Sequence, residues 1–154
     1  MTRRKRRDQV RIIYQGVPLN GVVALKLRMQ NSIDKRQNEI LELSAIEAAK
    51  RMQRLTPFKT GVARSNWSVA RDGENPPFDD SKLGRGWPVD TTGLFGIFGQ
   101  GPVMIRNRTP YIIDLEFGSS RQAPNGMMRI TVPELPLITK SIARSTRGKA
   151  VIKK

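Results

Sequence analysis

The sequence contains no cysteine and no histidine among its 154 residues. The absence of cysteine excludes disulfide bonds, thiolate metal sites and a cysteine nucleophile. The absence of histidine removes the most common general base, the usual zinc ligand and the middle member of a serine–histidine–aspartate triad. An enzyme built from this chain would have to use carboxylates, lysine or tyrosine alone. We therefore predict no catalytic residue, no metal ion and no cofactor.

Aromatic residues and long apolar runs are also scarce. Aromatics make up 6% and hydrophobic residues 38% of the chain, so the predicted core is thin and part of the stability is expected to come from neighbouring subunits. No apolar run approaches the ~20 residues that a membrane span needs. The run Val10–Tyr14 is too short and too polar for a signal-peptide core. We therefore expect no membrane partner, no secretion and a reducing compartment.

Acidic residues are few, and the resulting positive charge is concentrated at the two ends. Lys and Arg number 28 against 13 Asp and Glu, a formal net charge of +15. Residues 1–12 carry +5 and residues 140–154 carry +6, which leaves +4 between them. Such polycationic ends usually bind nucleic acid, anionic membranes or acidic protein surfaces. The run Arg3–Arg7 is equally compatible with an unstructured solubilising arm. The predicted contacts with DNA or an acidic partner are Arg3, Arg4, Lys5, Arg6, Arg7, Lys149, Lys153 and Lys154.

Length and patterning predict one α+β domain at residues 10–146, between a basic arm at 1–9 and a basic tail at 147–154. The arm is expected to be disordered in isolation, because its like charges repel and it has nothing apolar to bury. The domain would contain one long helix packed on a small antiparallel sheet of about four strands. A long loop insertion is predicted at residues 72–95.

The long helix is predicted over Ser32–Leu55. Apolar side chains recur at steps of three and four residues from Leu41 to Leu55, the spacing of one helical face. We assign Ser32 as the N-cap. Pro57 should end the helix, because it disfavours the helical conformation at Thr56.

Shorter elements complete the predicted domain. Strands are predicted at Val10–Tyr14, Ala63–Arg71, Ile97–Phe98, Val103–Asn107 and, from apolar–polar alternation, Met128–Val132. The segment Val22–Met29 fits either a helix or a strand, and Leu137–Ala143 predicts a short closing helix. Trp67 is predicted to lie in the core. Gly61 is predicted to supply a positive φ in the turn after the long helix.

The loop at residues 72–95 is rich in glycine, proline and aspartate. A loop of this length is usually functional or disordered. Its aromatic side chains favour docking onto a neighbour, and stacking on bases is the less favoured alternative for Phe95 and Phe98. Gly93, Gly96, Gly99 and Gly101 lack the lysine of a phosphate-binding loop, so a flexible turn is favoured there. The predicted subunit-interface residues are Phe78, Trp87, Phe95, Phe98, Asp114 and Glu116.

Two carboxylates, Asp114 and Glu116, lie in the apolar segment Tyr111–Phe117. They could form a metal-binding or acid–base pair, but no third ligand lies at a recognisable spacing. Ion pairs with arginines, within or between subunits, are therefore favoured. The two share a face only if the segment is extended. We expect Tyr111, Ile112, Leu115 and Phe117 to bury together in a short helix or a bent strand.

Two blocks of the sequence carry a resemblance to a known family. The first is Leu55–Trp67, LTPFKTGVARSNW, and the second is Asn107–Val132, NRTPYIIDLEFGSSRQAPNGMMRITV. Together they cover about a quarter of the chain. Their order resembles that of the tail-completion, or head–tail joining, family of long-tailed bacteriophages. In that family a helix end, a Pro-x-x-Thr-Gly turn and a strand precede an Asn…Pro-Tyr…Glu-x-Gly-Ser segment and a Gln-Ala-Pro-x-Gly-Met turn.

The resemblance implies a non-enzymatic structural protein of the virion neck, assembled in the host cytoplasm. Copies would form a closed homo-oligomeric ring, for which we expect six subunits. The ring would join the portal or head-closure proteins to the tail tube or tail terminator, with packaged DNA in its lumen. Two rival hypotheses are a basic nucleic-acid-binding module without enzymatic activity and a carboxylate-dependent nuclease. The nuclease is disfavoured because the sequence has no Glu-x-Lys or Gln-x-Lys pairing.

Overall fold

The computed structural model describes residues 13–14, 17–18, 21–71, 77–84, 86–94 and 102–147, with side chains described from Lys35 onward. The chain divides into two compact units, residues 1–36 and 37–154. In the first unit, β1 (Ile13–Tyr14) pairs antiparallel with β2 (Val17–Pro18). The strand predicted at Val10–Tyr14 is thus confirmed at Ile13–Tyr14, and its first three residues lie outside the described ranges.

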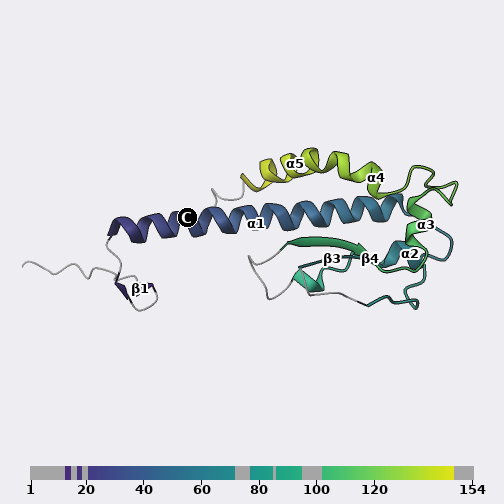
Figure 1. The fold of residues 1–154 in the computed structure, drawn as a ribbon, viewed down its shortest axis with the longest axis horizontal. Coiled ribbons are helices and arrows are strands. Elements are labelled where there is room, and N and C mark those ends of the chain that lie inside the picture. Colours follow the sequence, from purple (N-terminus) through teal and green to yellow (C-terminus); the bar gives the residue numbers. More distant parts are fainter. Residues whose placement is uncertain are drawn as a thin grey trace, which may run out of the picture. The chain divides into compact units, whose positions relative to one another are not determined.

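The long helix α1 spans Gly21–Leu55 (Figure 1). The prediction of an N-cap at Ser32 is wrong, because the helix begins eleven residues earlier and includes the undecided segment Val22–Met29. Residues 22–31 contain no glycine or proline, so nothing in them stops a helix. The end at Leu55 is confirmed. There the Thr56 hydroxyl and amide both donate to the Met52 carbonyl oxygen, at 2.7 and 2.9 Å.

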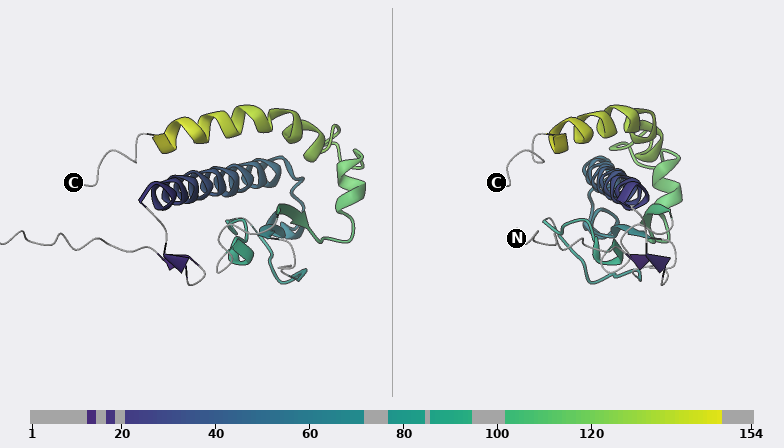
Figure 2. Two further views of the ribbon diagram at one scale, coloured as in Figure 1. Left: turned by 60° about the vertical axis from the view of Figure 1, so that its left-hand side comes forward. Right: turned by 90° about the vertical axis from the view of Figure 1, so that its left-hand side faces the viewer.

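In the second unit, residues 37–55 of α1 lie between a small sheet and the C-terminal helix (Figures 1 and 2). The sheet consists of β3 (Trp67–Arg71) and β4 (Val103–Asn107), paired antiparallel from Trp67↔Asn107 to Arg71↔Val103. Helix α2 (Val62–Ser65) precedes β3, so the predicted strand at Ala63–Arg71 is wrong in its first half. The mixed α+β fold, with the long helix packed on the sheet, is confirmed.

Within the described ranges the sheet has two strands, fewer than the predicted number of about four. Among the described residues β3 gains only one further neighbour, a parallel bridge between Ser68 and Asp90. The strand predicted at Met128–Val132 is wrong, because these residues form helix α4 (Met128–Thr131) and the start of the 3-10 helix η2 (Val132–Glu134). The predicted strand Ile97–Phe98 lies outside the described residues.

The core joins the second half of α1 to the sheet. Trp67 is 1% exposed, and its indole N–H donates to the Thr56 hydroxyl at 2.7 Å, so its predicted core position is confirmed. A buried ion pair, Arg71 with Glu42 at 2.5 Å, ties the end of β3 to α1. The buried apolar cluster is Ala49, Met52, Trp67, Val69, Val89, Leu94, Ala123 and Met127.

The C-terminal helix α5 spans Leu135–Arg147, longer than the predicted Leu137–Ala143. Pro136 lies in its first turn, where a missing N–H costs nothing. Helix α5 runs antiparallel to α1 (Figures 1 and 2). The Arg51–Glu134 ion pair, at 2.6 Å, links α1 to the end of η2, directly before α5. No helix in the described ranges is both long and apolar enough to cross a membrane.

Candidate interaction surface

The two sequence blocks that carry the family resemblance meet in space. The Phe58 amide N–H donates to the Gln122 side-chain oxygen at 2.9 Å, and the Gln122 amide donates back to the Phe58 carbonyl oxygen at 3.3 Å. The Asn107 side-chain amide donates to the Ala63 carbonyl oxygen at 2.7 Å. Because these bonds join backbone to side chain across 44 to 64 residues of sequence, Leu55–Trp67 and Asn107–Val132 form one structural unit.

A groove of about 680 Å³ lies between the two blocks. We call it the motif groove. Its walls are apolar and hydroxyl-bearing, and its charged residues are two cations, Lys59 and Arg121. Both cations are exposed, and neither makes an ion pair within the described part of the chain. The lining residues are Pro57, Phe58, Lys59, Thr60, Gly61, Ala63, Tyr111, Leu115, Ser119, Ser120, Arg121 and Gln122.

One edge of the motif groove is built by the turn at Gly61. This residue has φ +94°, as predicted, and a Cβ atom there would lie 2.1 Å from the Gly84 carbonyl oxygen. The Gly84 amide donates to the Thr60 carbonyl oxygen at 2.8 Å. Glycine is therefore required twice over, for its backbone conformation and for this close approach. The turn therefore lies directly against the loop that contains Gly84.

The opposite edge is lined by Leu115 of the short helix α3 (Ile112–Glu116), by its N-cap residue Tyr111 and by Ser119–Gln122 of the loop after it. Helix α3 is labelled in Figure 1, and Figure 2 shows it from two further sides. The expected joint burial of the segment is correct only for Ile112 and Leu115, which pack against the core. Tyr111 is 42% exposed and Phe117 is 73% exposed. The reason is helical geometry, because a single turn of helix sends neighbouring side chains in different directions.

The two carboxylates of this segment have different surroundings. Glu116 accepts the amide N–H groups of Met127 and Met128 at 2.8 and 2.9 Å through one oxygen, and that of Arg129 at 2.9 Å through the other. The Arg129 guanidinium lies 3.6 Å away. The Asp114 carboxylate is exposed and makes no hydrogen bond or ion pair within the described ranges. Glu116 thus caps α4, and Asp114 points to solvent.

The electrostatics of Glu116 follow from this cap. Burial raises its pKa, but the three amide N–H donors and the Arg129 charge favour the ionised form more strongly, so the pKa lies below the ordinary 4.5. The cap also explains why α4 is helical in spite of its alternating sequence. Its first amides are satisfied by a side chain from a distant part of the chain.

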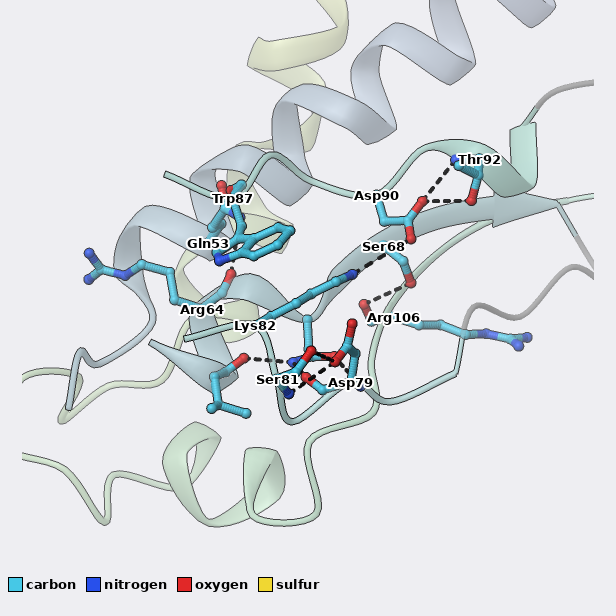
Figure 3. A network of polar contacts seen from close by, with 12 residues as sticks. Gln53, Arg64, Ser68, Asp79, Ser81, Lys82, Trp87, Asp90, Thr92 and Arg106 are labelled. Carbon is cyan, nitrogen blue, oxygen red and sulfur yellow. Dashed lines mark hydrogen bonds and ion pairs between the residues drawn. The ribbon is translucent and has the colours of Figure 1, made fainter. Parts of the chain in front are cut away.

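The described part of the long loop, residues 77–84 and 86–94, is tied to the body by hydrogen bonds (Figure 3). The Gln53 amide donates to the carbonyl oxygens of Arg64 and Trp87, at 3.0 and 3.1 Å. Asn66 exchanges two hydrogen bonds with the Asp79 backbone, at 2.8 and 2.9 Å. The loop ends in the 3-10 helix η1 (Thr92–Leu94). Its described part is therefore an anchored surface without regular strands.

Two acids of this loop, Asp79 and Asp90, are also held internally. Asp90 accepts the amide and hydroxyl of Thr92, at 3.0 and 2.7 Å, and faces Lys82 at 4.0 Å (Figure 3). Burial raises the pKa of Asp90, but these partners outweigh it and the pKa lies below 3.8. The pKa of Asp79 is lowered by its hydrogen bonds with Ser81 and by Lys82, in spite of a smaller opposing effect of burial.

The residues predicted to form the subunit interface are dispersed over the described surface. Phe78 is 36% and Trp87 45% exposed, and the Trp87 indole donates to the Leu83 carbonyl oxygen at 2.9 Å. Gly93 is buried in η1. The remaining predictions lie outside the residues whose side chains are described: Phe95, Phe98, Gly96, Gly99, Gly101, Arg3, Arg4, Lys5, Arg6, Arg7, Lys149, Lys153 and Lys154.

Sequence reasoning missed the exposed face of α3 and the cations of the motif groove. Ile113 and Phe117 are 64% and 73% exposed. Their spacing of four residues in the sequence is that of one helical face. The segment was also compatible with a bent strand, so this face was not identified. Lys59 lies in the first sequence block and Arg121 in the second. Their positive charge was the feature of the sequence that could have identified them as binding residues.

No cluster of three or more acidic side chains able to hold a metal ion occurs in the described ranges. Searches against protein-family models, curated proteins and solved structures each found no match for this chain.

Proposed function

We propose that this chain is a non-enzymatic structural protein of the neck of a long-tailed bacteriophage. Copies form a closed ring that joins the DNA-filled head to the tail. The observation that carries the proposal is the meeting of the two resemblance blocks, through the Phe58–Gln122 and Asn107–Ala63 hydrogen bonds, around one groove. Sequence motifs that share a function are expected to converge on one surface, and these converge although they are far apart in the sequence.

The exposed apolar side chains support an assembled state. Single exposed apolar residues are ordinary, but contiguous ones mark interaction surfaces. Ile113 of α3 and Phe117, the C-cap residue of α3, are four residues apart, and each is more than 60% exposed. A closed ring needs two different faces of one subunit that fit each other. The motif groove and the exposed face of α3 are two such faces of different shape.

The charge of the chain supports a partner of opposite sign. Six copies at +15 would carry a formal +90, which no compact ring tolerates without anions. DNA in the lumen and acidic neighbouring rings supply counter-charge. In this proposal the basic ends contact these partners, and the folded body forms the ring.

The direct test is a joining assay. Heads and tails are prepared from particles that lack this protein, and the purified chain is added before electron microscopy. The proposal predicts a rise in joined particles that saturates with added protein, with density for the chain at the junction. Unchanged numbers of joined particles, together with absence of the chain from the neck of intact particles, would contradict it.

A second candidate, a basic nucleic-acid-binding module, is favoured by one observation, the +5 and +6 charges of the two ends. Removal of residues 1–9 separates the two hypotheses. A module that acts only by DNA binding should lose most of its affinity, and the remaining affinity should depend less steeply on salt. A ring protein truncated in this way should still self-assemble.

A further inference from the structure

Helix α3 presents two opposite faces to two different environments. Ile113 and Phe117 are four residues apart and therefore share one face. Tyr111 and Leu115 are offset from them by two residues, or about 200° around the helix axis. This second pair lines the motif groove. The first pair is mostly exposed; the Arg129 guanidinium, whose charge is offset by Glu116 at 3.6 Å, lies 5.3 Å from the centroid of the Phe117 ring. The α3 segment thus lines the groove on one side and presents exposed apolar side chains on the other.

The motif groove has the chemistry of a receptor for an apolar segment that carries a negative charge. Its volume of about 680 Å³ lies within the range of about 300–1,000 Å³ in which proteins bind small ligands or side-chain clusters. Aromatic and aliphatic walls offer apolar contact. Lys59 and Arg121 are left without an ionic partner in the described ranges, and no carboxylate lines the groove to repel an anion.

The exposed side of α3 has the complementary chemistry. Three of the carboxylates whose side chains are described make no hydrogen bond or ion pair within the described ranges. They are Glu39 on α1, Asp80 in the loop and Asp114 on α3. Asp114 is next to Ile113 and one helical turn from Phe117. These two neighbours are 64% and 73% exposed, whereas Phe78, the aromatic neighbour of Asp80, is 36% exposed. We call Ile113, Asp114 and Phe117 the α3 ridge.

We propose that the α3 ridge of one copy docks into the motif groove of the next copy. Ile113 and Phe117 would pack against the apolar walls, and Asp114 would face Lys59 and Arg121. The contact is heterologous, because ridge and groove are different faces of the subunit, and it therefore propagates from copy to copy until a ring closes. This inference rests on the proposed ring function and identifies the contact that would build it.

Charge reversal tests the contact. Lys59→Glu with Arg121→Glu reverses the groove, and Asp114→Arg reverses the ridge. Either change places like charges opposite each other, so the dissociation constant for self-association should rise at least about tenfold. The chain that carries all three changes should regain most of its self-association, because opposite charges face each other again. Sedimentation velocity over a concentration series measures these constants.

Matched controls separate this contact from net charge. Lys140→Glu with Arg144→Glu changes the net charge as much as the groove variant does, on exposed positions of α5. Glu39→Arg does the same for the ridge variant, at an exposed carboxylate on α1. Both controls should assemble as the wild type does. Circular dichroism and urea unfolding check that every variant is folded.

A second measurement avoids any dependence on charge-reversed variants. The chain has no cysteine, so Arg121→Cys and Asp114→Cys each carry a single thiol. A short bismaleimide linker should join a mixture of the two variants into covalent dimers, and should join neither variant alone. A mixture of Arg121→Cys and Glu39→Cys is the control and should stay unlinked.

The outcomes distinguish this contact from the proposed function. If the wild type assembles and the reversed variants assemble equally well, the ridge–groove contact is wrong and the ring proposal stands. If the mixture of Arg121→Cys and Asp114→Cys assembles but forms no linked dimers, the ridge–groove contact is likewise wrong and the ring proposal stands. If the wild type remains monomeric at every concentration, the ring proposal and this contact both fall.

Discussion

The anchored loop and the α3 region differ in how far their polar groups are satisfied within one subunit. In the loop, residues 77–84 and 86–94, Asp79 and Asp90 are held by hydroxyls and amides, and Gln53 clamps the backbone. Around α3, Asp114, Lys59 and Arg121 have no such partners in the described ranges, and Phe117 is 73% exposed. Two acids of the described loop, Asp79 and Asp90, are thus satisfied by their own chain, and Asp80 is the exception. The α3 side has the composition of a surface completed by another molecule.

The largest expected effect lies in the core that supports both regions. Trp67→Ala removes a side chain that is 1% exposed, together with its hydrogen bond to Thr56. We expect a loss of about 3–5 kcal/mol in the free energy of unfolding. Urea denaturation followed by fluorescence of the remaining Trp87 measures it. A loss below about 1 kcal/mol would mean that the core is not organised around Trp67.

The next effect tests the junction between the two regions. Gly61→Ala forces a side chain into positive φ and against the Gly84 carbonyl oxygen, 2.1 Å away. We expect destabilisation of about 3 kcal/mol or more, from backbone strain and the collision together. Gly86→Ala is the matched control, because Gly86 has φ +102° with nothing within 4 Å of the added Cβ. It should cost about 1 kcal/mol. If both variants lose the same free energy of unfolding in urea, the close approach of Gly61 to the Gly84 carbonyl oxygen is contradicted.

A smaller effect concerns the Glu116 cap inside the α3 region. Glu116→Gln keeps the shape and removes the charge, so we expect a loss of about 1–2 kcal/mol at pH 7. Because the pKa of Glu116 is lowered in the folded state, its contribution is present above pH 4.5 and is lost as the pH falls through the folded pKa. The difference in unfolding free energy between wild type and variant should therefore shrink in acid. A difference that is constant from pH 7 to pH 3 would contradict the assignment.

The smallest effect on stability should accompany a large effect on assembly. Phe117→Ala removes a side chain that is 73% exposed and whose ring lies under the Arg129 guanidinium, so the unfolding free energy of the monomer should fall by no more than about 1 kcal/mol, the size of an exposed cation–π contact. Self-association should nevertheless weaken strongly if Phe117 is an interface anchor. Dilute-solution unfolding and concentration-dependent sedimentation, applied to the same sample, measure the two properties. A large fall in the free energy of unfolding with unchanged self-association would mean that Phe117 supports the fold and not an interface.

Local sequence rules predicted the parts of the fold that depend on neighbouring residues. Pro57 ended α1 at Leu55, and Gly61 adopted positive φ in the turn. The strand Val103–Asn107 was predicted with its observed bounds. These features rest on proline sterics, glycine conformation and apolar periodicity, which act over a few residues.

Tertiary contacts decided the parts that sequence reasoning did not reach. Met128–Val132 alternates like a strand but is helical, because Glu116 caps its first amides from 11 to 13 residues away. The motif groove depends on the pairing of Phe58 with Gln122, 64 residues apart. No local pattern encodes such a meeting. Ser32 failed as a helix start because a good cap residue is also tolerated inside a helix when nothing upstream stops it.

The central claim is that this chain works as a subunit of a closed ring. Its most direct test is the native mass of the purified wild-type protein, measured over a wide range of concentrations. The account predicts one discrete assembly, expected to hold six copies, that resists growth as concentration rises. A protein that stays monomeric at the highest concentration, or forms an open-ended ladder of sizes, would contradict it.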